Sequence, residues 1–311
     1  MTVALHFCCM VVKSTLRSGG RHLPVWGGRA LWRIRKKAAF IRKHGYAPNL
    51  KSPKRFSEKL LKRILDGHDP NYARYAMKLQ AHHFVKELGI QGLKVAAQLK
   101  VVSVLSPADF DDLPDAFVVK SSFGSGLNEV VTNKAKCDVE AVCRRFNDRL
   151  PRVRNARNES ASDNVILIEA FIGNPHHGVP DDYKFHCFHR ENGEFHCFIQ
   201  VDSSRFGEHR QTIFDIEFSR VDLQFAGQTR HETLPEAPAR LGEMLGIARK
   251  LSAGFDYVRI DLFHCQDGIY FGEFTPFHRG GTAPISPMAW ENQWGDLWDQ
   301  RFPDYQPISL G

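Results

Sequence analysis

The residues best suited to chemistry lie in two apolar segments near the C-terminus, VRIDLF and GIYFGEFT. Side chains alternate along a strand, so Arg259 and Asp261 share one face of the first segment. On the second segment, Glu273 shares a face with Phe271 and Thr275. A hairpin that joins the two segments would therefore bring two carboxylates and one guanidinium together.

The turn between these segments sets the register of the hairpin. A three-residue loop, Gln266–Gly268, is predicted because such loops often end in a glycine with a left-handed backbone. This loop pairs Cys265 with Ile269, Phe263 with Phe271, and Asp261 with Glu273. Directly opposed carboxylates repel each other, and protonation of one, the neighbouring arginine or a divalent cation would relieve the repulsion. Mg²⁺ together with a phosphate suits such oxygen ligands, whereas the alternative is a solvated hairpin face with mild repulsion.

The positive charge of the chain is concentrated at its N-terminus. The 311 residues carry a formal net charge of +7, but residues 1–57 hold thirteen Lys or Arg and no acid. The remainder therefore carries a net charge of −6, which argues against a nucleic-acid enzyme with a basic groove. Seven cysteines without a CxxC pair fit a reduced, cytoplasmic compartment. The apolar stretch 3–12 is short and precedes the basic tract, which argues against a secretory signal.

The basic segment contains an expected amphipathic helix over Arg29–Lys43. Its apolar stripe consists of Leu31, Ile34, Ala38 and Ile41. The favoured interpretation is that this stripe packs on the main body. A second interpretation is peripheral contact with an anionic membrane at its inner face, and a transit peptide ranks third.

The remaining patterns predict helices mixed with mostly antiparallel strands, which is an α+β fold. Helices are expected over 57–66, 71–88, 138–150 and 238–255. Strands are expected over 93–102, 116–120, 165–172, 183–190 and 194–202, the last two as a hairpin around Glu191–Gly193.

The segment FVVKSSFGSGLNEVV ends a strand in Lys120 and continues into a glycine-rich loop. Glycines let backbone N–H groups approach an anion closely, and the lysine adds a full charge. The Gly-Lys-Ser order of a Walker loop is absent, so the segment is interpreted as a hairpin lid over phosphates. A plain glycine-rich turn is the alternative. Downstream, VILIEAFI holds a single acid, Glu169, and its edge could offer backbone groups to an adenine or be an ordinary core strand.

The order of these motifs resembles the ATP-grasp superfamily, and most closely its TupA-like branch, which is associated with cell-wall and surface polysaccharide or peptide-polymer synthesis. The resemblance runs from Leu50 to Trp298 and includes NLKSPKRFSEKL, AMKLQAHHFVKELGI, FVVKSSFGSGLNEVV, ILIEAFIG, DYKFHCF and YFGEFTPF. The combination is specific, although no single motif is. Departures are Thr275 where asparagine is common, Met77 where aspartate is common, and Ser57 where asparagine is usual.

The resemblance implies a role for each matching position. ATP-binding residues would be Lys78, Lys120, Ser122, Gly124, Ser125, Gly126, Glu169, Ala170, Phe171 and Ile172. The Mg²⁺ ligands would be Asp261, Glu273 and Thr275, of which the threonine is a poor ligand that leaves a second metal in doubt. Arg259 and Lys184 would be catalytic, the first steadying the phosphoryl group and the second reaching a phosphate.

The implied protein is an ATP- and Mg²⁺-dependent ligase that activates a carboxylate as an acyl phosphate for attack by an amine. Two α/β lobes with mostly antiparallel sheets would sandwich ATP. The expected divisions are the basic segment 1–49, an N-terminal part 50–115, a glycine-rich lid lobe 116–172 and a metal-binding lobe 173–311. The alternatives are a phosphotransferase acting on a sugar hydroxyl and a non-catalytic nucleotide-binding protein. No nucleic-acid partner is expected.

Two histidine-containing segments have competing interpretations. The hairpin register would place Cys187 opposite Cys197 with His189 on the same face, which is either a zinc site or, more commonly, buried cysteines. His278 and Arg279 follow the second carboxylate strand and are either contacts to the acceptor substrate or part of a surface loop.

Overall fold

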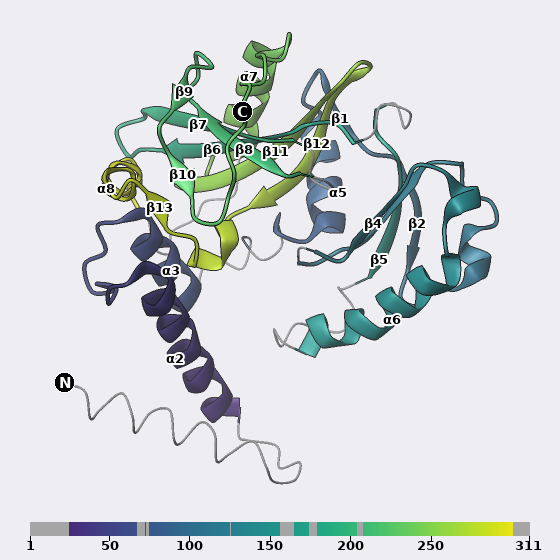
Figure 1. Ribbon diagram of the computed structural model, residues 1–311, viewed down its shortest axis with the longest axis horizontal. Helices are drawn as coiled ribbons and strands as arrows, with labels where there is room; N and C mark the ends of the chain where they lie inside the picture. The colour runs from purple at the N-terminus through teal and green to yellow at the C-terminus, as the bar shows by residue number, and fades with distance from the viewer. Residues whose placement is uncertain are drawn as a thin grey trace. The chain divides into compact units, whose positions relative to one another are not determined.

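The computed structural model describes residues 25–66, 72, 75–124, 126–155, 165–173, 179–203 and 208–300, with backbone alone for 25–29 and 151–155 (Figure 1). The chain divides into two compact units, Met1–Ala47 and Pro48–Gly311. No helix among the described residues is long and apolar enough to cross a membrane.

The first unit contains helix α2, Val25–His44, whose first turn holds no acid and whose last turn ends in Arg42, Lys43 and His44. Within it, the Phe40 ring stacks on His44 with centroids 3.9 Å apart. Ile34 and Ile41, two residues of the predicted apolar stripe, are 57% and 44% exposed.

The second unit is built on a seven-stranded sheet with the order β1-β12-β11-β6-β7-β8-β9. Its strands are β1 Leu93–Val95, β6 Asp182–His189, β7 Phe195–Ser203, β8 Arg210–Phe214, β9 Arg220–Val221, β11 Tyr257–Cys265 and β12 Gly268–Thr275. Every strand pairing of the described residues is antiparallel except that of β1 with β12. The predicted hairpin around Glu191–Gly193 is confirmed as β6 and β7.

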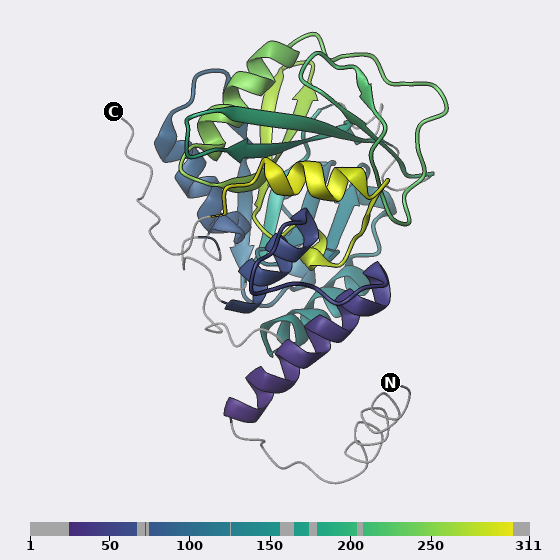
Figure 2. The same ribbon diagram turned by 90° about the vertical axis from the view of Figure 1, so that its left-hand side faces the viewer.

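Helices cover this sheet on both faces (Figures 1 and 2). Helices α5, Lys78–Leu88, and α7, Leu241–Ser252, pack on one face, where alternate residues such as Val258 and Ile260 form an apolar core. On the other face, α3, Phe56–Asp66, and α8, Ala289–Asp296 (yellow in Figure 2), form a core with Phe188 and Tyr257. Two short strands, β10 Gln224–Phe225 and β13 Ile285–Ser286, pair beside it. The rest of that second face is polar.

A separate four-stranded sheet with the order β2-β5-β3-β4 belongs to the same unit. Its strands are β2 Gln98–Val102, β3 Phe117–Ser121, β4 Asn128–Val131 and β5 Ile166–Ala170. Helix α6, Val139–Asn155, and the short helix η1, Pro107–Phe110, pack on its core, and η2, Lys134–Lys136, follows β4. Helices with two mainly antiparallel sheets confirm the predicted α+β fold.

Two element predictions need correction. The strand expected over 93–102 is two strands in different sheets, because the chain leaves β1 at Val95 and enters β2 at Gln98. The helix expected over 71–88 is not continuous. Helix α5 begins at Lys78, because Met77 has an extended backbone (φ −88°, ψ 114°). The Lys78 amide instead donates to the Ser122 carbonyl of the glycine-rich hairpin, 2.7 Å away. The break therefore places Lys78 at a helix start beside that hairpin.

Candidate active site

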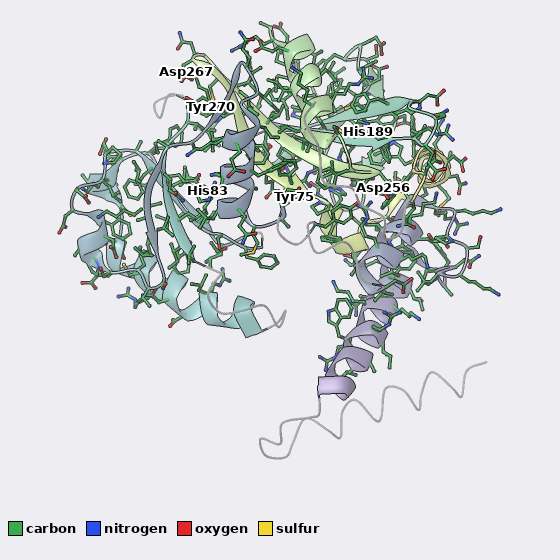
Figure 3. The ribbon with its side chains drawn as sticks, turned by 180° about the vertical axis from the view of Figure 1, so that it is seen from behind. Tyr75, His83, His189, Asp256, Asp267 and Tyr270 are labelled. Atoms are coloured by element: carbon green, nitrogen blue, oxygen red, sulfur yellow. The ribbon has the colours of Figure 1, made fainter. Side chains whose placement is uncertain are left out.

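The hairpin of β11 and β12 places Asp261 opposite Glu273, as predicted, but by a different route. Its loop has two residues, Gln266 and Asp267, and it pairs Cys265 with Gly268 and Phe263 with Tyr270. At the tip, the Tyr270 hydroxyl donates to Asp267 at 2.6 Å (Figure 3). The predictions of a three-residue loop and of the pairs Cys265–Ile269 and Phe263–Phe271 were therefore wrong.

A β-bulge at Gly272 restores the predicted pairing of the carboxylates. Leu262 pairs with Phe271, yet the next residue of β11, Asp261, pairs with Glu273, so Gly272 is the extra residue. The two-residue loop places Phe271 opposite Leu262 in the apolar core, contrary to the prediction that Phe271 shares the face of Glu273, and the bulge then puts Glu273 on the other face. A Cβ at position 272 would lie 3.0 Å from the Asp261 carbonyl oxygen, so glycine is required by the close approach of the strands.

Arg259 is the centre of the polar face that this hairpin presents. Its Nε and Nη2 donate to the two oxygens of Asp261 at 2.6 and 2.7 Å, and Nη2 also donates to Glu273 Oε1 at 2.8 Å. Thr275 Oγ1 donates to the same Glu273 oxygen at 3.0 Å. Of the three means of relieving the opposed carboxylates, the structure contains the bridging arginine.

The electrostatic surroundings separate the two carboxylates. Burial raises the pKa of Asp261 to about 7, against the opposing effects of Arg259 and Lys184. Burial alone would also raise the pKa of Glu273, but Arg259 and then Lys78 lower it to about 2. The charge of Lys78, on helix α5, therefore acts on the carboxylate of β12.

The polar face continues across three further strands. Strand registers place Lys184 opposite Asp261 and Gln200, His186 opposite Arg259, and Asp202 opposite Asp182 and Gln211. Residues opposite each other in antiparallel strands lie on the same face, so this row is continuous from β12 to β8. Its members beyond those predicted are Asp182, His186, Gln200, Asp202 and Gln211.

Lys184 is buried within this row and surrounded by carboxylates. Its ammonium forms ion pairs with Asp182 and, at 2.8 Å, with Asp202, and it lies 4.0 Å from Asp261. Burial alone would lower the pKa of Lys184, but these three aspartates raise it. Burial would raise the pKa of Asp202, but Lys184 lowers it, and Gln200 and Gln211 donate to it at 2.9 and 2.8 Å. Lys184 is therefore a fixed cation beside Asp261.

Two buried histidines lie beside Arg259, His278 in direct contact and His186 opposite it on the neighbouring strand. His278 Nδ1 accepts from Arg259 Nη1 at 2.9 Å, and burial lowers its pKa well below the usual value. Burial also lowers the pKa of His186 to about 3, and its ring nitrogens lie 3.0 Å from the Tyr257 hydroxyl and 3.1 Å from Gln200 Oε1. Both rings are neutral at pH 7. The surface-loop interpretation of His278 was therefore wrong.

A second group of predicted residues gathers around the glycine-rich hairpin of β3 and β4. Lys78 Nζ donates to the Gly124 carbonyl at 2.7 Å, and Lys120 Nζ pairs with Glu169 Oε2 of β5 at 2.5 Å. Gly124 and Gly126 have φ of 79° and 87°, which favours glycine at both positions. Ser125 lies outside the described residues.

The remaining predicted residues of this group are Ser122, which follows β3, and residues in and after β5. Ser122 is buried, and its hydroxyl accepts from the Val165 amide at 3.0 Å, so it links the hairpin to β5. The Ala170 amide donates to the Ala97 carbonyl at 2.8 Å. Phe171 and Ile172 follow the strand and are half-buried. Among the described residues, no strand pairs with Phe171 or Ile172.

His82 was not predicted but joins the two groups. It lies one turn after Lys78 on α5, its Nδ1 is 3.4 Å from Glu169 Oε1, and its ring packs edge-on against Phe271 at 5.8 Å. Burial, followed by the charge of Lys120, lowers its pKa to about 3. Its spacing of four residues from Lys78 was the signal that the sequence offered.

The competing zinc interpretation has no support in the described residues. Cys187 does pair with Cys197 in register, and both are buried free cysteines. His189 Nε2 instead lies 2.8 Å from the Ser252 hydroxyl. No group of three or more His, Cys, Asp or Glu side chains in the described ranges is arranged to hold a metal ion.

Alternation within β6 and β7 could have revealed the residues that were missed. In DYKFHCFH, Asp182, Lys184 and His186 occupy every second position, and FIQVDS repeats the pattern with Gln200 and Asp202. This is the same two-residue period that identified Arg259 and Asp261. Alternation along each strand, however, does not show which strands lie side by side in the sheet.

Comparison with known proteins gives one family. A model of the TupA-like ATP-grasp family matches residues 58–298, about three quarters of the chain. No curated protein matches the chain significantly.

Several solved structures are similar to the second unit at low identity. They include D-alanine–D-alanine ligase from Helicobacter pylori (19% identity, 72% of this chain and 57% of that chain, TM-score 0.39). D-alanyl-alanine synthetase A from Vibrio cholerae matches with 14% identity, 79% and 69% coverage and a TM-score of 0.43. Phosphoribosylamine–glycine ligase from Thermotoga maritima matches with 13% identity, 66% and 48% coverage and a TM-score of 0.40. The chain spans 57% of the length of the first of these and 48% of the third.

Proposed function

The chain belongs to the TupA-like ATP-grasp family, and from this premise we propose that it is an ATP-dependent ligase forming a carbon–nitrogen bond. In the proposed reaction, ATP phosphorylates a carboxylate, and an amine attacks the resulting acyl phosphate. The observation that carries the proposal is the contact of Arg259 with both Asp261 and Glu273 on adjacent strands.

Nucleotide binding is assigned to the residues around the glycine-rich hairpin. Lys78 and Lys120 supply two cations beside a loop of left-handed glycines, which suits phosphates. Glu169 and the backbone of Ala170–Ile172 would line the adenine. Ser122 would hold the hairpin against β5, in agreement with its buried hydroxyl.

Mg²⁺ is assigned to Asp261 and Glu273. The polar face holds three buried carboxylates, Asp182, Asp202 and Asp261, and the partly exposed Glu273, against two cations, Lys184 and Arg259. When all four carboxylates are ionised, a divalent ion would balance the excess negative charge. Mg²⁺ is commonly held by one or two carboxylates together with substrate phosphates, which is the set available here. Thr275 already donates to Glu273, which favours a single protein-bound ion.

The chain's own residues would act mainly by position and charge. Arg259 is held at three nitrogens, so its guanidinium would face the transferring phosphoryl group with little reorganisation. Lys184, fixed by Asp182 and Asp202, would neutralise a further phosphate oxygen. Mg²⁺, when bound, would supply neutralisation of the terminal phosphates.

The first test is calorimetry of ATP binding with and without Mg²⁺. Wild type is expected to bind ATP in a Mg²⁺-dependent manner, and Asp261→Asn/Glu273→Gln is expected to lose at least tenfold in affinity. Asp267→Asn, an exposed acid at the tip of the same hairpin, is the matched control and should bind as wild type. The single variant Glu273→Gln keeps the Asp261–Arg259 pair in case the double variant does not fold. Equal binding by wild type and double variant, or none by wild type, would reject the site.

Product analysis then separates the ligase from a phosphotransferase. A ligase releases ADP and phosphate only when a carboxylate and an amine are both present, whereas a kinase leaves a phosphorylated hydroxyl. Synthesis of a surface polysaccharide or another cell-envelope polymer is the setting that we propose for this reaction. A nucleotide-binding protein without catalysis would release no ADP with any substrate pool.

We also propose that residues 29–43 contact an anionic membrane. Helix α2 exposes Ile34 and Ile41 among basic residues, which is typical of helices that lie in a lipid interface. Full-length protein should float with vesicles containing phosphatidylglycerol but not with pure phosphatidylcholine, and Ile34→Asp/Ile41→Asp should lose flotation. Equal flotation with both vesicles, or by the variant, would contradict this contact.

A further inference from the structure

Arg279 occupies a strained turn directly after the strand that carries Glu273. The short helix η4, His278–Gly281, contains three consecutive left-handed residues: Arg279 (φ 47°, ψ 24°), Gly280 (φ 61°) and Gly281 (φ 68°). The second and third are glycine, which adopts this conformation freely, whereas an arginine is strained there. Non-glycine residues in such conformations cluster at functional sites, so the arginine needs an explanation.

The side chain of Arg279 lies at the edge of the polar face. Its guanidinium carbon is 5.7 Å from the centre of the Phe225 ring, and Nη1 is 3.5 Å from the Ala226 carbonyl oxygen. The same Phe225 ring contacts His278 at 4.5 Å and His186 at 5.7 Å. Arg279 is thus adjacent to the histidines that support Arg259.

Arg259 contacts both Glu273 and His278, the neighbour of Arg279 in the chain. Its Nη2 donates to Glu273, whose pKa the charge of Lys78 also lowers, while its Nη1 donates to His278. Arg279 contacts Phe225 and Ala226, whereas Lys78 and Lys120 contact Gly124 and Glu169, so an anion held by Arg279 would be distinct from the phosphates.

The charge of Arg279 is not balanced by any ion pair in the described part of the chain. The neighbouring segments differ, since Arg210 pairs with Glu208 and Glu232, and Arg230 pairs with Asp222. Arg279 is half-buried, and burial lowers its pKa although Asp202 opposes this. Because no carboxylate of the described residues lies within ion-pair distance, an anion can bind the Arg279 guanidinium without displacing a protein partner.

We propose that Arg279 binds an anionic group, a carboxylate or a phosphate, of the substrate that is joined rather than of ATP. The proposal rests on the ligase function given above, and it assigns an acidic molecule as the acceptor. A guanidinium suits both anions because it donates two parallel hydrogen bonds.

The test uses two variants that suit the left-handed backbone, Arg279→Gly and Arg279→Asn. Full-length protein is first saturated with MgADP, so that the phosphate-binding lysines are occupied. Malonate and inorganic phosphate are then titrated separately at constant ionic strength, with binding followed by calorimetry. Wild type is expected to bind one of the two anions, which identifies the group, and both variants are expected to lose at least tenfold in affinity. Arg240→Asn removes a surface guanidinium paired with Glu243 and should bind as wild type.

Thermal unfolding without anion separates function from folding. Both Arg279 variants should unfold at a higher temperature than wild type, because the backbone strain is removed while anion binding is lost. Wild-type protein that binds neither anion, or variants that bind as well as wild type, would overturn the proposal. If MgADP itself does not bind, the proposed function fails, and the same titrations on the nucleotide-free chain still decide the role of Arg279.

Discussion

Three histidines beside the candidate site, His82, His186 and His278, are buried and carry no charge at neutral pH. Their rings instead serve as neutral hydrogen-bonding and packing groups next to Lys120, Arg259 and Tyr257. Burial disfavours the protonated form. Each ring therefore binds a proton less readily in the folded protein than in the unfolded chain. The free energy of unfolding should therefore depend on pH through these single residues.

We predict that His82 makes the protein less stable as the pH falls. Its pKa is about 3 when folded and 6.5 as a model value, so between these values the unfolded chain binds a proton that the folded chain does not. Stability contributed by the neutral ring is complete above pH 6.5 and decreases toward pH 3, by about 2 kcal/mol at pH 5 relative to pH 7. In urea unfolding, the loss of unfolding free energy from pH 7 to pH 5 should be smaller in His82→Gln than in wild type by about this amount.

The control for this prediction is the next residue on the same helix. His83 is exposed on α5 (Figure 3), so His83→Gln should retain the pH dependence of wild type. If His82→Gln and wild type lose the same free energy of unfolding between pH 7 and pH 5, His82 is not held neutral by burial.

Among the structural elements, the β11–β12 hairpin depends on one glycine. The bulge at Gly272 moves Glu273 onto the face of Asp261, while the register set by the loop keeps Phe271 in the apolar core. Without the extra residue, the two-residue loop would carry the register Phe263–Tyr270 and Leu262–Phe271 onward and pair Asp261 with Gly272 instead. The bulge thus determines whether the proposed metal ligands face each other.

We predict that Gly272→Ala destabilises the protein and weakens Mg²⁺-dependent ATP binding. The added Cβ would lie 3.0 Å from both the Asp261 carbonyl oxygen and the Phe263 ring, so the strands must separate. Overpacking of this kind costs about 1–3 kcal/mol of unfolding free energy, to be measured by urea denaturation. Gly246→Ala, in α7 with no atom within 4 Å of its new Cβ, should be stabilising by up to ~1 kcal/mol. Unchanged stability and ATP affinity in Gly272→Ala would contradict the role given to the bulge.

In the second unit, the buried carboxylate of Glu291 connects segments that are far apart in the sequence. Glu291 of α8 accepts hydrogen bonds from the Ser57 amide at 2.9 Å, the Ser57 hydroxyl at 2.7 Å and the Ile285 amide at 3.1 Å. Burial raises its pKa, and these donors oppose the increase. The RFSEK motif near the start of the family resemblance therefore has a structural explanation, because its Ser57 joins α3 to α8.

We predict that Glu291→Ala is among the more damaging single changes outside the candidate site. It leaves three buried donors without a partner, which costs roughly 3 kcal/mol or more of unfolding free energy. Ser57→Ala removes only the hydroxyl contact and should cost about 1 kcal/mol, while the exposed Glu236→Ala should change stability by less than about 0.5 kcal/mol. Urea denaturation of the three variants checks this order, and a Glu291→Ala protein as stable as Glu236→Ala would refute it.

Much of the site could be predicted from sequence because its patterns are local. A two-residue period places Arg259 with Asp261 on one strand face, whatever the strand packs against, and a short loop forces two adjacent strands to pair. The same reasoning gave the β3–β4 hairpin with Lys120 and the pairing of Cys187 with Cys197. The family resemblance was carried by the order of such local motifs, and the family match confirms it.

Only the tertiary structure decided which of these strands lie side by side and which side chains meet. The sheet order brings Asp202 to Lys184, the turn after β12 brings His278 to Arg259, and the break before α5 brings His82 to Glu169. These contacts join residues 18 to 87 positions apart, and no periodicity extends over such distances. Alternation and turn chemistry act between chain neighbours, whereas burial, register across strands and the resulting pKa shifts depend on packing. The sequence alone thus determined the chemistry available on each strand, and the fold determined how it is combined.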